Sequence, residues 1–162
     1  MDYLTSILGP ENIDYFTRLL VAFVFGSVLG IERVLAHKTA GMRTYALVSL
    51  GAALFVVMSV SVVKDFSGIS NYDPLRVASQ IVVGLGFLGA GVIIFRGERL
   101  SGLTTAAGLW VSGAIGAAAG FGLYAIAGFT TLLVLFIFSA LWFLEKEIKK
   151  ISGVWDEDID RT

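Results

Sequence analysis

The sequence predicts an all-α membrane protein, a bundle of five transmembrane helices, from its composition, its long apolar runs and the placement of its basic residues. Of the 162 residues, 56% are hydrophobic and only 15% are charged. Soluble globular domains are about 45–50% apolar and about 25% charged. The composition therefore excludes a soluble enzyme, a disordered linker and a nucleic-acid-binding domain.

Five runs of the chain are each long and apolar enough for the roughly 20 residues that a membrane-spanning helix needs. They cover residues 13–35, 44–63, 74–95, 103–120 and 123–144. Residues 13–144 therefore form one transmembrane domain, with an interfacial segment at 1–12 and a short cytoplasmic tail at 145–162. No block of residues is left for a second domain.

Basic residues gather on one side of these five runs. Nine of the 12 lie at or after the C-terminal end of the first, third or fifth run, whereas only Lys64 lies on the opposite side. Loops that stay in the cytoplasm carry an excess of Lys and Arg. We therefore expect the N-terminus outside and the C-terminus in the cytoplasm.

Small residues recur at helical spacing, which allows helices to approach one another closely. Packing within the chain is the leading interpretation, with a subunit interface or a local helix break around a cavity as alternatives. The packing residues that we predict are Gly26, Gly30, Gly86, Gly89, Gly108, Ser112, Gly116 and Gly120.

Residues 84–89 also match the dinucleotide-binding fingerprint G-x-G-x-x-G. That motif needs a soluble helix after it and an acidic residue about 20 positions further on. Here the apolar run continues, and position 109 is Leu109. The motif is therefore not interpreted as a nucleotide site.

Ionisable side chains at membrane depth cost roughly 2.5–3.5 kcal/mol at a helix centre, so they are the first functional candidates. Asp73, Arg76 and Gln80 share one face of the third run. Asp73 precedes Pro74 and also suits an N-cap. We expect Arg76 to face the bundle interior and to contact Asp73 or a group on another helix.

Glu32 lies beside Arg33 at the end of the first run, where an interfacial salt bridge is the simplest interpretation. The same carboxylate can neutralise Arg43 or Arg99. Its alternative role is that of a ligand for a cation or a proton.

Thr104 and Thr105 begin the fourth run, where their hydroxyl groups cap the helix or face a polar cavity. The N-terminus of this predicted helix and the nearby arginines are also compatible with a bound anion. The polar site that we predict comprises Glu32, Arg33, Arg43, Asp73, Arg76, Gln80, Arg99, Thr104 and Thr105.

Catalytic and cofactor chemistry is not indicated. One histidine and no cysteine leave no multi-histidine or thiolate metal site within one chain. No nucleophile–base pair suggests hydrolysis. We expect no enzymatic activity and no cofactor, and we assign no metal.

Several segments resemble the MgtC/SapB family of membrane proteins. The matching pieces lie between about residues 19 and 144, in the family's order, and they are 30–33 (GIER), 40–44 (AGMRT), 73–80 (DPLRVASQ), 84–91 (GLGFLGAG) and 102–110 (GLTTAAGLW). The resemblance implies a multi-pass protein of a bacterial inner membrane with five spans.

The resemblance also implies a function. The family's best-known branch is tied to growth at low magnesium and to survival inside phagocytes, and it acts on membrane machines such as the F-type ATP synthase. That branch carries Asn at the position of Thr104, Cys at the position of Val111, and a soluble C-terminal domain. This chain departs from all three, so ATP synthase inhibition is not carried over.

Two functions follow as expectations. The first is a non-enzymatic regulator of other membrane machinery, linked to magnesium or envelope homeostasis and to virulence-like adaptation. The second is a small ion or solute transporter or channel, for instance for Mg²⁺, that uses the polar residues of the bundle. We expect a homodimer in the lipid bilayer, a further membrane protein as a partner, and no nucleic acid.

Overall fold

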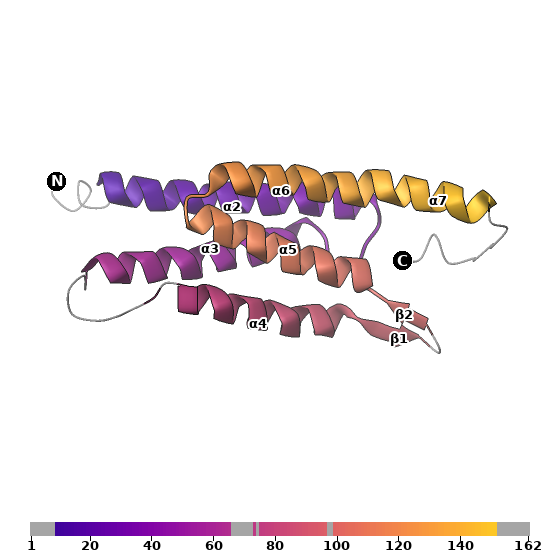
Figure 1. The fold of residues 1–162 in the computed structure, drawn as a ribbon, viewed down its shortest axis with the longest axis horizontal. Helices are drawn as coiled ribbons and strands as arrows, with labels where there is room; N and C mark the ends of the chain where they lie inside the picture. The colour runs from indigo at the N-terminus through magenta and orange to yellow at the C-terminus, as the bar shows by residue number, and fades with distance from the viewer. Residues whose placement is uncertain (1–8, 66–72, 74, 97–98, 152–162) are drawn as a thin grey trace.

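The computed structural model describes residues 9–65, 73, 75–96 and 99–151. These residues form a bundle of helices and one short hairpin (Figure 1). The helical elements are α2 (Pro10–Leu35), α3 (Met42–Asp65), α4 (Leu75–Val92), α5 (Leu103–Gly120), α6 (Tyr124–Phe136), the π-helical segment η1 (Ile137–Leu141) and α7 (Trp142–Ile151). The hairpin consists of β1 (Ile94–Arg96) and β2 (Arg99–Ser101).

Four helical segments within the described residues are long and apolar enough to cross a membrane. They are Met42–Val63, Leu75–Val92, Leu103–Gly120 and Tyr124–Ile148. The predicted helical fold class is therefore confirmed, and the chain has the character of a membrane protein. Helix α2 is 26 residues long but is not among the four, so the fifth span and the orientation stay predictions.

The core lies where α2, α3 and α5 pack together. Leu29, Tyr45 and Ile115, one from each helix, are at most 2% exposed. Helix α4 lies along one side of the bundle, and α2 with α6 and α7 lies along the other, with α5 between them (Figure 1). Helix α4 packs against α5 and α3.

Glycines allow the three core helices to approach to backbone contact. A Cβ atom added to Gly26 would lie 2.7 Å from the carbonyl oxygen of Tyr45, and one added to Gly116 would overlap the backbone of Ser49. Hydroxyl groups then bond across the same contacts. Ser49 Oγ donates to the carbonyl of Ala22 at 2.7 Å, and Ser112 Oγ donates to that of Tyr45 at 3.1 Å.

The remaining predicted packing glycines differ in their surroundings. Gly30 lies against the backbone of Met42, and Gly120 lies against that of Ala53. Gly89 has ordinary contact distances to Ala106, whereas a Cβ atom at Gly86 would meet nothing within 4 Å. Gly86 therefore makes no close helix contact with the residues that the structure describes.

The third predicted run, residues 74–95, is helical only to Val92. Beyond it, β1 pairs with β2 in antiparallel register, Phe95 opposite Leu100. The run ends in Val92, Ile93, Ile94 and Phe95, which are β-branched or aromatic and favour an extended backbone. An apolar run of this kind does not by itself distinguish helix from strand.

Candidate functional site

A buried arginine lies at the C-terminal end of α2. The side chain of Arg33 is 3% exposed, and its Nε–H donates to the carboxylate of the adjacent Glu32. Its guanidinium group also lies over the ring of Phe138, with Cζ 3.6 Å from the ring centroid. A buried cation is strongly destabilising without such partners, so the ion pair and the aromatic face together stabilise Arg33 here.

Phe138 reaches Arg33 from the π-helical segment η1. Such segments are rare, and they frequently occur at functional sites. Gly108 of α5 makes room for the ring, because a Cβ atom there would lie 2.7 Å from Phe138 Cζ and would overlap the hydroxyl group of Tyr45. Tyr45 is fully buried and donates to the carbonyl of Thr105 at 3.4 Å. Residues of α2, α3, α5 and η1 thus meet around Arg33.

The end of α2 is closed by a Schellman turn. The His37 N–H donates to the carbonyl of Val34 at 3.0 Å, and the Lys38 N–H donates to that of Arg33 at 2.9 Å. This turn requires a left-handed residue after the helix, usually glycine. His37 occupies that position with φ 55°, and it is the only non-glycine residue with positive φ among those described.

A cavity of about 860 Å³ opens beside this turn. Glu32, Arg33, Lys38 and Thr104 line one part of it, and η1 and the start of α7 supply the rest. Burial lowers the pKa of the Lys38 ammonium group, and so does the nearby Arg33 guanidinium. The carboxylate of Glu32 acts in the opposite direction with a smaller effect.

The structure brings together only part of the polar site predicted from the sequence. Glu32, Arg33 and Thr104 line the cavity, and Thr105 is buried beside it. Arg43 is exposed in the first turn of α3 and does not line the cavity. Arg99 lies in β2, but the structure does not describe its side chain.

Asp73, Arg76 and Gln80 lie at the opposite end of the bundle, where α4 begins (Figure 1). Asp73 Oδ1 accepts a hydrogen bond from the Leu75 N–H at 2.9 Å, which is a capping role. Arg76 is exposed and forms no ion pair with any residue that the structure describes. The prediction that it faces the interior is wrong, because α4 lies at the side of the bundle and its first turn is open.

A second arginine was not singled out from the sequence. Arg18 of α2 pairs with Asp14 at 2.7 Å, and its Nη1 donates to the carbonyl of Gly120 at 2.9 Å. That carbonyl belongs to the end of α5, where a cation is favourable. The spacing of Asp14 and Arg18, four residues apart on one helix, is the available sequence signal.

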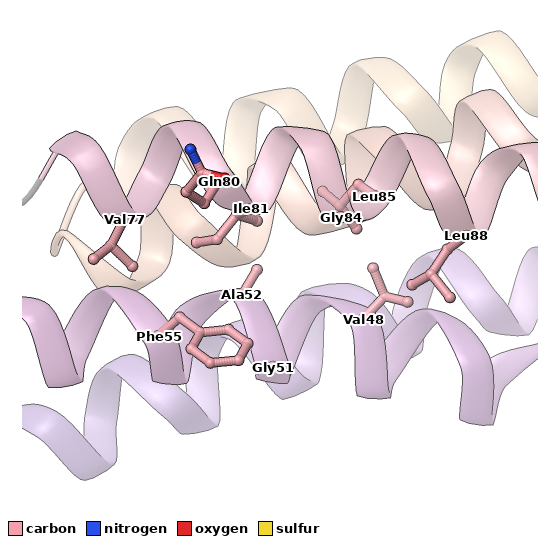
Figure 2. A pocket seen from close by; sticks show the side chains of 10 residues that line it. All are labelled: Val48, Gly51, Ala52, Phe55, Val77, Gln80, Ile81, Gly84, Leu85 and Leu88. Atoms are coloured by element: carbon pink, nitrogen blue, oxygen red, sulfur yellow. The ribbon is translucent and has the colours of Figure 1, made fainter.

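An apolar groove of about 370 Å³ runs between α3 and α4. Val48, Ala52 and Phe55 of α3 face residues of α4 across it (Figure 2). Gln80 is the one polar side chain of the lining, and its amide group points away from α3 (Figure 2). It forms no hydrogen bond with any described residue. Cβ atoms at Gly51 and Gly84 would meet nothing within 4 Å, so both glycines leave the groove open.

Metal-ligating side chains do not gather in the described part of the chain. No three His, Asp or Glu residues there are placed so that they could hold a metal ion.

Comparisons with known proteins identify relatives. The model of the MgtC family matches residues 19–147. A Brucella abortus protein named MgtC is 47% identical over 114 residues, which cover 70% of this chain and 45% of that protein. Escherichia coli YhiD, whose name proposes magnesium transport, is 40% identical over 135 residues, covering 80% of this chain and 63% of YhiD.

An uncharacterized Haemophilus influenzae protein is 38% identical over 136 residues, which cover 82% of this chain and 57% of that protein. The chain thus spans about half to two thirds of the length of these relatives. No solved structure matches the chain.

Proposed function

The chain belongs to the MgtC family, and from that premise we propose that it is a non-enzymatic regulator in the bacterial inner membrane. In this proposal it binds a transmembrane helix of another membrane protein in the groove between α3 and α4. The process served is magnesium or envelope homeostasis, in keeping with the magnesium-related name of YhiD.

Helix α2 is the fifth span in this proposal. Its 26 residues rise by about 1.5 Å each and give a length of about 39 Å, more than the hydrocarbon core of about 30 Å. Four of its five charged residues form pairs in the two end portions of the helix, Asp14 with Arg18 and Glu32 with Arg33. The basic residues favour the cytoplasm for the Glu32 end and the C-terminus.

Gln80 is the observation that carries the proposed partner site. An amide at membrane depth without a hydrogen-bond partner is unfavourable. A helix that lies over the groove and also covers the exposed side of α4 at Gln80 would supply that partner, and Gly51 and Gly84 would let its backbone come close. Neighbouring helices of the same chain occupy the space beside the glycines of α2 and α5, whereas the space beside Gly51 and Gly84 is open.

Transport has less support because the polar side chains do not form one path. The Arg33 cluster and the Asp73 group lie at opposite ends of the bundle (Figure 1). Between them, the α2–α3–α5 core is closed by side chains such as Leu29 and Ile115. Homodimer formation stays a prediction. A second copy of this chain is the alternative occupant of the groove between α3 and α4.

Filling the groove tests the proposed function. Gly84 and Gly86 both have open space, but only Gly84 lines the groove. In a strain that depends on the protein for growth at low magnesium, we expect Gly84→Leu to abolish growth and Gly86→Leu to preserve it. Both variants must reach the membrane at the native level.

Liposomes that contain the purified chain separate regulation from transport. The regulator account expects no Mg²⁺ flux above that of empty liposomes. Native growth of the Gly84→Leu strain, or Mg²⁺ flux through the native protein, would contradict the proposed function.

A further inference from the structure

The cavity beside Arg33 has a charged part and an apolar part. Arg33, Lys38 and Thr104 belong to the first, and Leu35 and Leu141 belong to the second. We propose that this cavity binds the phosphate of a membrane phospholipid, with the acyl chains along the apolar part. The site lies apart from the groove between α3 and α4, so the inference does not depend on the partner proposed for that groove.

The charges of this cavity leave one cation available to an anion. Glu32 neutralises Arg33 through a direct ion pair. Lys38 lines the same cavity and forms no ion pair with any described residue. At the Lys38 ammonium group the repulsion by Arg33 outweighs the attraction by Glu32. An anion bound beside Lys38 would offset this repulsion.

A second carboxylate limits the charge of the ligand. Glu145 of α7 also lines the cavity and has an interaction of its own. Its negative charge disfavours a dianion such as inorganic phosphate. A phosphodiester carries a single negative charge, so the head group of a phospholipid fits this balance better. The exposed hydroxyl group of Thr104 is a further donor at the cavity.

The apolar part of the cavity favours a lipid over a soluble phosphate. Ile137, Leu141 and Phe143 line it and are about half exposed. Trp142 also lines the cavity, and Nζ of Lys146 lies 5.3 Å from the centroid of its ring. Tryptophan and lysine at a helix end are typical of the level where lipid head groups meet the hydrocarbon core.

Native mass spectrometry of the full chain in detergent tests this proposal. Phosphatidylglycerol is titrated against the native protein, Lys38→Gln and Arg43→Gln. Arg43 is an exposed cation in the next helix that does not line the cavity, so its variant is the matched control. We expect binding about tenfold weaker for Lys38→Gln and unchanged for Arg43→Gln.

Two further ligands identify the chemistry that is recognised. Diacylglycerol, which has the acyl chains without the phosphate, is expected not to bind, and inorganic phosphate is expected not to compete. Equal binding by Lys38→Gln and the native protein would overturn the site. Equal weakening in both variants would show general surface attraction, and competition by inorganic phosphate would overturn the lipid as the ligand.

Discussion

The guanidinium group of Arg33 lies 3.6 Å from the centroid of the Phe138 ring, measured at Cζ, and it pairs with Glu32 from the same helix. This contact joins the end of α2 to η1, 105 residues further along the chain. It fixes one wall of the larger cavity. Phe138 lies in the π-helical segment η1, which separates α6 from α7.

Phe138→Leu is predicted to destabilise the folded chain by about 2 kcal/mol, because the cation loses its aromatic face and a void is left. Chemical unfolding in detergent micelles measures this change. Phe136→Leu is the control: Phe136 is 59% exposed, and its replacement should change the free energy of unfolding by less than about 0.5 kcal/mol. Equal effects of the two substitutions would remove any special role of the ring over Arg33.

Gly116→Ala is predicted to destabilise the chain by about 2 kcal/mol or more, since the new methyl group overlaps the backbone of Ser49. Gly86→Ala meets open space, and higher helix propensity should make it neutral or stabilising by up to about 1 kcal/mol. The same micelle unfolding assay compares them. A harmless Gly116→Ala would contradict the close approach of α3 and α5.

His37→Gly is predicted to stabilise the chain by about 1 kcal/mol, because a left-handed residue other than glycine is strained. His37→Ala keeps that strain and should bring no such gain. Thermal unfolding of the two variants beside the native chain gives the comparison. If His37→Ala stabilised the chain as much as His37→Gly, the result would contradict the left-handed conformation of residue 37.

The pKa of Lys38 is predicted to lie below its ordinary value of 10.5, for the reasons of burial and repulsion by Arg33. NMR titration of isotopically labelled, dimethylated lysines reads it out. Glu32→Gln removes the opposing attraction and should lower the pKa further. The folded chain holds the Lys38 proton less tightly than the unfolded chain does. The free energy of unfolding should therefore rise as the pH increases from the pKa of Lys38 in the folded chain to its ordinary value of 10.5. A pKa of Lys38 that rises in Glu32→Gln would refute this electrostatic account.

Hydrophobic run length was enough to locate the helices. The predicted run at 103–120 has the same bounds as α5, and the run at 13–35 lies within α2. The hairpin was missed because apolar β-branched residues at 92–95 satisfy a helix and a strand equally. The π-helical segment was missed because no residue pattern in the last run marks it.

The candidate site was only partly predictable. Glu32 and Arg33 were found because charged residues are rare in such a sequence, and their salt bridge is formed. Phe138 and Tyr45 were not found, because nothing in an apolar stretch tells which aromatic side chain will meet a cation. Arg76 was misplaced because the helix pattern shows which residues share a face but not which face the bundle covers.

Site-specific photo-crosslinking in native membranes tests most directly whether the groove between α3 and α4 receives a helix of another protein. A photoreactive residue replaces Ile81, which lines the groove, or Leu132, which is exposed on α6 and does not. We predict one adduct with a different membrane protein from position 81, lost in Gly84→Leu, and none from position 132. An adduct of twice the chain mass, or equal labelling from both positions, would contradict the account.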